Sequence, residues 1–121
     1  MTTAAPISTR ALDHPAREEI RLEGVLHALS DPMRLRVVRQ LAGCRPGLEG
    51  LSCSQIDLPV TKSTSTHHFR VLRESGVIQQ IYRGTAKLNG LRREDLDELF
   101  PGLLDSVLAA ATAQVKRTGA P

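Results

Sequence analysis

The chain has very few aromatic residues: two phenylalanines, one tyrosine and no tryptophan among 121 residues. Proteins that bind single-stranded nucleic acid or RNA loops stack bases on aromatic side chains, so this scarcity argues against that class. A run of about 18 apolar residues is also absent, as is the pattern of a secretory signal peptide. We therefore expect a cytoplasmic protein that makes no use of a membrane.

Cysteine and histidine are too sparse for a metal site. Cys44 and Cys53 lie nine residues apart across a Gly- and Pro-rich loop, which is not the spacing at which two thiolates hold one ion. The neighbours His67 and His68 would point about 100° apart on a helix. No spacing typical of a catalytic triad and no glycine-rich phosphate loop is present. The sequence predicts no enzyme, no metal and no cofactor.

The two cysteines are too few for a disulfide scaffold, and in a cytoplasmic protein both thiols are expected to be reduced. A thiolate near an arginine or a helix N-terminus is activated, so Cys53 is a candidate for a redox switch. Simple buried packing of that side chain is the alternative.

One stretch carries the clearest local signals of a helix with two different faces. Pro59 precedes it, Thr61 or Ser63 can serve as N-cap, and Gly76 suits a left-handed stop, which predicts a helix over about residues 62 to 75. At helical spacing the packing face holds Ser65, Phe69 and Leu72, with His68 at its edge, and the polar face holds Ser63, His67, Arg70 and Glu74, flanked by Thr66. The polar face suits a DNA duplex; a merely solvated surface is the alternative.

Positive charge is concentrated around this helix. Residues 62–93 contain seven lysines and arginines against Glu74 alone, although the formal net charge of the whole chain is only +3. A polyanionic partner requires a local field of this kind. Double-stranded DNA is therefore the expected partner.

The run STSTHHFRVLRESGVI (Ser63–Ile78) resembles the recognition helix and exit strand of ArsR-type winged helix-turn-helix repressors, where a Ser-rich start leads into His-His-Leu and then Leu-Arg-Glu-Ala-Gly. The run LSDPMRLRVV (Leu29–Val38) resembles the opening of that family's second helix. The resemblance covers about residues 20 to 110. It implies a mainly α-helical winged helix-turn-helix fold with a small β-hairpin wing, and a homodimer that represses transcription from a two-fold operator.

The chain departs from this family in its sensing motifs. A thiolate sensor there resembles Cys-Val-Cys-Asp, whereas Leu51-Ser52-Cys53-Ser54 has one cysteine, and no histidine follows His68 to build the zinc site of the last helix. The third helix, at residues 51–56, is also shorter than is usual in the family. The effector is left open: a small molecule, a redox change, a partner or none.

Periodicity and turn residues divide the chain into a disordered tail (1–14), one DNA-binding domain (15–115) and a flexible tail (116–121). We expect a first helix over 16–30 and a second from Pro32 to Gly43, with Arg34, Arg36 and Arg39 on or near the solvent side of the second. A hairpin wing should follow, with strands at 77–82 and 86–89. A short helical segment should begin at Arg92, and a final helix at Leu103.

The expected sites follow from these elements and from the resemblance. The DNA-binding residues would be Lys62, Ser63, Thr64, Thr66, His67 and Arg70 on the helix, with Arg83 and Lys87 at the wing. By resemblance the first and last helices pair two subunits through Leu22, Leu26, Leu103, Leu104, Val107, Leu108 and Ala111. Alternatives are a last helix that packs only on its own core, a winged helix that binds a protein instead of DNA, and a double-stranded RNA binder.

Overall fold

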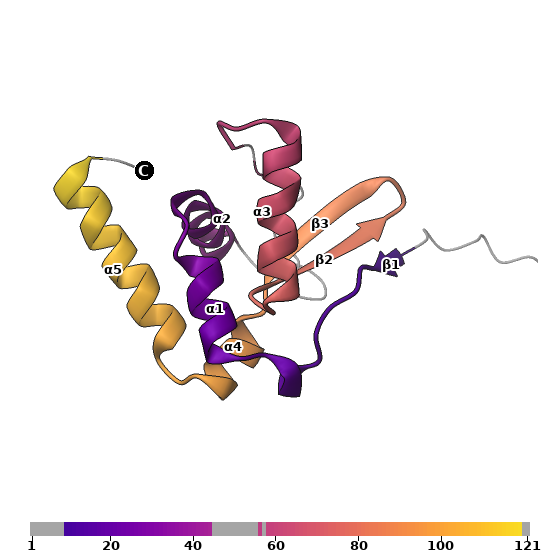
Figure 1. The fold of residues 1–121 in the computed structure, drawn as a ribbon, viewed down its shortest axis with the longest axis horizontal. Coiled ribbons are helices and arrows are strands. Elements are labelled where there is room, and N and C mark those ends of the chain that lie inside the picture. Colours follow the sequence, from indigo (N-terminus) through magenta and orange to yellow (C-terminus); the bar gives the residue numbers. More distant parts are fainter. Residues whose placement is uncertain (1–8, 45–55, 57, 120–121) are drawn as a thin grey trace, which may run out of the picture.

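The computed structural model describes residues 9–44, 56 and 58–119 (Figure 1). In chain order its elements are β1 (Thr9–Ala11), the 3-10 helix η1 (Arg17–Glu19), α1 (Leu22–Leu29), α2 (Pro32–Gly43), α3 (Lys62–Glu74), β2 (Ile78–Arg83), β3 (Ala86–Leu91), α4 (Arg93–Leu99) and α5 (Leu103–Thr118). These helices and the small antiparallel sheet confirm the predicted winged helix-turn-helix fold. The third helix expected at 51–56 lies, apart from Ile56, outside the described residues.

Helix α2 begins and ends where its local signals indicate. The Asp31 carboxylate accepts hydrogen bonds from the backbone N–H groups of Met33 (2.8 Å) and Arg34 (3.2 Å), and Pro32 occupies the first turn, where its missing N–H costs nothing. The helix ends at Gly43. The apolar face of α2 then packs on α1 and α3, and the core is formed chiefly by Val25, Ala28, Val37, Val38, Leu41, Phe69, Leu72, Ile78, Leu96 and Leu104.

The single first helix predicted over 16–30 is wrong. The chain forms η1, passes through Ile20 in an extended conformation (φ −72°, ψ 125°) and only then enters α1. This break lets the Ile20 side chain, 7% exposed, join the core directly against Gly76. A continuous helix would not direct Ile20 in this way, so a contact between distant residues overrides the apolar periodicity.

The disordered tail predicted for residues 1–14 is wrong for its last part. Strand β1 pairs antiparallel with β2, so the sheet has the order β1-β2-β3. Further along, the His14 imidazole Nε2 accepts a hydrogen bond from the Gln80 backbone N–H at 2.9 Å. The predicted two-stranded wing is therefore three-stranded, as Figure 1 shows at the sheet edge.

The C-terminal boundary of the domain also moves. Helix α5 continues to Thr118 and ends at Gly119, whose φ of 71° is left-handed, so a flexible tail from residue 116 is wrong for residues 116–118. Within the described part of the chain, no helix combines the length and apolarity that a membrane crossing requires.

The expectation of two reduced thiols is also wrong, because Cys44, which follows α2, is disulfide-bonded. The candidate redox residue, Cys53, lies outside the described residues.

Candidate nucleic-acid interface

Helix α3 presents the two faces that its sequence predicts. His68, Phe69 and Leu72 are buried, at 8%, 9% and 0% exposure. The opposite face is exposed along its whole length and carries Lys62, Ser63, Thr64, Thr66, His67 and Arg70. The N-cap is Thr61, whose hydroxyl accepts from the Thr64 N–H at 3.2 Å. Backbone N–H groups in the first turn have no helical acceptor, which makes this end of α3 suited to a phosphate.

The central pair of the exposed face is His67 and Arg70. One Arg70 guanidinium nitrogen lies 3.3 Å from His67 Nδ1. Arginine can only donate, so Nδ1 is the acceptor and the neutral ring carries its proton on Nε2. The two side chains therefore support each other one helical turn apart, and between them they offer the donors that recognise base edges in the major groove.

The sequence placed Arg34 on or near the solvent side of α2, and this is wrong: the residue is only 7% exposed. Its guanidinium donates to the Ala28 carbonyl at 2.8 Å and to His68 Nδ1 at 3.2 Å. The signal was present in the sequence, because Arg34 shares the helical phase i, i+3, i+4, i+7 with Val37, Val38 and Leu41. Arg34 thus joins α1, α2 and α3 at one point.

The carboxylate of Asp31 adds an electrostatic contact to this junction. Its Oδ1 lies 3.9 Å from His68 Nε2, the nitrogen that must carry the proton when Nδ1 accepts from Arg34. Burial by itself would raise the pKa of Asp31, but the backbone N–H donors of Arg34 and Met33 and the positive charge of the Arg34 guanidinium outweigh it and hold that pKa below its usual value. The same carboxylate thus caps α2 and faces the imidazole of α3.

A second buried polar chain fixes the wing relative to α3. The Arg73 guanidinium donates to Gln80 Oε1 at 2.7 Å, and Gln80 Nε2 donates to Asn89 Oδ1 at 2.7 Å. Gln80 and Asn89 are 1% and 5% exposed, so the bond between them is shielded from water, whereas the bond from Arg73 is partly buried. These bonds run from the last turn of α3 across both hairpin strands, and they hold α3 and the wing in one orientation.

The wing carries a basic cluster centred on one aromatic ring. The Arg10 guanidinium lies 5.0 Å from the Tyr82 ring centroid and the Lys87 ammonium 5.7 Å from it, within the range of cation–π contacts. Of the two wing residues expected from sequence, Lys87 belongs to this cluster, and Arg83 pairs with Thr9 in the sheet register. Arg10 was missed because three residues of β1 have no periodicity; pairing with β2 brings it there.

The residues expected to pair subunits fall into two groups. Leu104 and Ala111 are buried in the subunit's own core, at 2% and 6% exposure, whereas Leu22 and Leu26 are the exposed large apolar side chains of the described residues, at 42% and 46%. Leu103 lines a surface depression with Leu22. Three more of the residues expected to pair subunits lie on α5 and are partly buried: Leu103, Val107 and Leu108. Accessible apolar surface is thus concentrated on α1 and the first half of α5.

Two comparisons with known proteins bear on this geometry. A family model described as a helix-turn-helix domain matches residues 29–81, from the end of α1 through α3 into β2. A protein of Bacillus subtilis (strain 168), named "Uncharacterized HTH-type transcriptional regulator YceK", is 32% identical over 92 residues, which cover 74% of this chain and 88% of that protein. Among the described residues, no group of three or more histidine, cysteine or acidic side chains could hold a metal ion.

Proposed function

The chain belongs to the helix-turn-helix transcriptional regulators, which bind DNA, and from that premise we propose that it is a homodimeric repressor of the ArsR type that binds a two-fold operator. Each α3 would enter a major groove, with half-sites about 10 bp apart, as in other dimeric helix-turn-helix proteins. Repression would follow from occlusion of a promoter by the bound dimer.

The observation that carries this proposal is the polar face of α3. It is continuously exposed and contains no acidic side chain from Lys62 to Arg73, while its opposite face is buried. Lys62, Ser63, Thr64 and Thr66 would bind phosphates and set the register, and His67 and Arg70 would read base edges. Arg83, Lys87 and Arg10 on the wing would contact the neighbouring backbone.

The homodimer is proposed on the exposed leucines of α1. Burial of Leu22 and Leu26 against the same face of a second copy, flanked by Leu103 and Val107, would remove apolar surface from water, and the terminal helices would form the seam. Leu26→Glu should give monomers in light scattering. Thr112→Glu places the same charge on exposed α5 surface away from Leu103 and should leave the dimer intact. A dimer that persists with Leu26→Glu would move the seam to another surface.

The test of DNA binding is a salt series with the purified protein, DNA from upstream of its own gene and a scrambled duplex of equal length. The specific complex should weaken with a log–log slope of about −0.9 per phosphate neutralised. Equal affinity for both duplexes would remove sequence specificity from the proposal. Failure to bind either duplex would favour a winged helix that binds a protein.

Single substitutions then separate base contacts from phosphate contacts. Arg70→Ala should cost about 1–3 kcal/mol on the operator and little on scrambled DNA. Arg10→Ala should weaken binding to both duplexes and reduce the salt slope by about 1. Arg117→Ala is the matched control, since it removes the same charge from exposed α5. Unchanged operator affinity with Arg70→Ala would remove Arg70 from the interface.

A further inference from the structure

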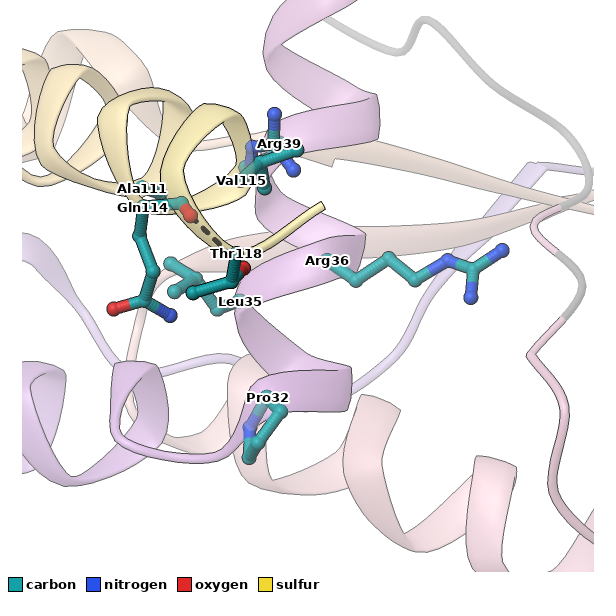
Figure 2. Close-up of a pocket in the computed structure, with 8 residues that line it drawn as sticks. All are labelled: Pro32, Leu35, Arg36, Arg39, Ala111, Gln114, Val115 and Thr118. Carbon is teal, nitrogen blue, oxygen red and sulfur yellow. Dashed lines mark hydrogen bonds between the residues drawn. The ribbon is translucent and has the colours of Figure 1, made fainter. Parts of the chain in front are cut away.

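A groove between α2 and α5 is unrelated to the polar face of α3. It has a volume of about 300 Å³ and is lined by Pro32, Leu35, Arg36 and Arg39 of α2 and by Ala111, Gln114, Val115 and Thr118 of α5. In Figure 2, Leu35, Arg39 and Val115 lie where α2 and α5 approach each other, whereas Arg36 extends away from α5. The volume lies at the lower end of the range for small-molecule sites, and its centre is aliphatic, as such sites commonly are.

The charge of the groove has one sign. Both ionisable residues in the lining, Arg36 and Arg39, are cationic, and within the part of the chain that the structure describes neither guanidinium takes part in an ion pair or hydrogen bond. By contrast, Arg17, Arg92 and Arg93 are each paired with carboxylates. An unpaired guanidinium beside an apolar surface is a suitable partner for a carboxylate, which it can bind through two parallel hydrogen bonds.

The lining residues also indicate the chemistry of the rest of a carboxylate ligand. Leu35, Ala111 and Val115 supply an aliphatic surface, and none of the eight lining residues is aromatic. The Thr118 hydroxyl already donates to the Gln114 carbonyl at 2.9 Å, drawn as a dashed line in Figure 2, whereas the Gln114 side-chain amide remains a donor at the rim. In Figure 2 the Arg36 side chain extends away from Leu35, so Arg39 is the first candidate for the carboxylate.

We infer that this groove binds a small aliphatic carboxylate, with its chain against Leu35 and Val115 and its headgroup on Arg39, and that binding changes the affinity for DNA. The regulatory part rests on the proposed function. Regulation is expected because helix α2 both lines the groove and carries Arg34. This buried residue donates a hydrogen bond to His68 of α3. A ligand that repositions α2 against α5 therefore acts on a helix bonded to α3.

The binding test is calorimetric titration of the full chain, without DNA, with octanoate, octylamine and octan-1-ol. Octanoate should bind saturably at one molecule per chain, and the amine and the alcohol about tenfold more weakly or not at all, since they lack the charged acceptor. Arg39→Gln should weaken octanoate binding by about tenfold. Arg117→Gln, on exposed α5 outside the groove, should leave it unchanged.

A substitution that keeps the charge tests the location independently. Val115→Trp fills the aliphatic part of the groove and should abolish octanoate binding with all arginines in place. Failure of octanoate to bind, equal binding of octanoate and octylamine, or full affinity in both Arg39→Gln and Val115→Trp would overturn the site.

The regulatory part is measured separately, as operator affinity with and without saturating octanoate. By linkage, the factor by which octanoate changes DNA affinity must equal the factor by which DNA changes octanoate affinity. Operator affinity that octanoate leaves unchanged would overturn regulation while leaving the site. Octanoate binding by a protein that binds no DNA would refute the proposed function instead, so the two failures are distinguishable.

Discussion

Replacement of Gly76 by alanine tests the junction between α3 and the wing. Gly76 follows the C-cap of α3 at φ +87°, and the N–H groups of Gly76 and Val77 donate to the carbonyls of Arg73 (3.1 Å) and Leu72 (3.0 Å), which is the Schellman arrangement. A Cβ added there would lie 2.5 Å from Ile20 Cγ1 and 2.7 Å from Ile20 Cδ1. Gly76→Ala therefore combines backbone strain with a steric clash in the core.

The expected magnitude follows from these two terms. A non-glycine residue in the left-handed region costs about 1–2 kcal/mol, and overpacking of a core costs about 1–3 kcal/mol. Gly76→Ala should therefore lower the free energy of unfolding by about 2–5 kcal/mol, a large share of a typical domain's stability. Gly102 has a similar φ of +80°, but an added Cβ would meet no atom within 4 Å. Gly102→Ala should thus cost only the backbone term.

The assay is urea unfolding of both variants, followed by circular dichroism. The difference between the two variants isolates the Ile20 contact, because the backbone strain and the change in unfolded-chain entropy are nearly common to both. In a double-mutant cycle, Ile20→Ala should cost less in the Gly76→Ala background than in the native chain, since the shortened side chain relieves the clash. Equal destabilisation by Gly76→Ala and Gly102→Ala would refute this reasoning.

Three further predictions concern the polar contacts. Arg34→Met leaves the Ala28 carbonyl and His68 Nδ1 without their donor and should cost about 1–3 kcal/mol of stability, with a larger loss of operator affinity than the control Arg36→Met. Asp31→Ala removes the cap of α2 and should lower the free energy of unfolding by about 0.5–2 kcal/mol. Because the pKa of Asp31 is lowered in the folded state, the stabilisation by this carboxylate is present above its ordinary pKa and is lost as pH falls through the folded pKa. The destabilisation by Asp31→Ala, measured by urea unfolding, should therefore become smaller in acid. Burial lowers the pKa of His14 below 6.5, so the stabilisation from its neutral imidazole, which accepts from the Gln80 N–H, is complete above pH 6.5 and is lost as pH falls through the folded pKa. Hydrogen exchange at the Gln80 amide should accelerate over that pH range. An exchange rate that changes with pH only as the intrinsic chemical rate does would contradict this prediction.

Much of α3 could be predicted because its signals are local. Thr61, Gly76 and the spacing of Phe69 and Leu72 define the ends and the buried side of α3, and helix geometry alone then places Arg70 on the other side. The start of α2 at Pro32 follows in the same way from its cap. Such features depend on residues within one or two turns of each other, so the sequence can be interpreted without knowledge of the fold.

The tertiary structure decided everything that depends on distant partners. Arg10 reaches the wing only because β1 pairs with β2, about seventy residues further on, and Arg34 is buried because His68 and Ala28 offer it acceptors. Leu104 and Leu26 carry the same side chain on two terminal helices, but packing buries one and leaves the other exposed. The sequence by itself determined where α2 and α3 form and which face of α3 is polar. Packing determined which charges are buried and which leucines remain available, because burial depends on neighbours that local periodicity does not specify.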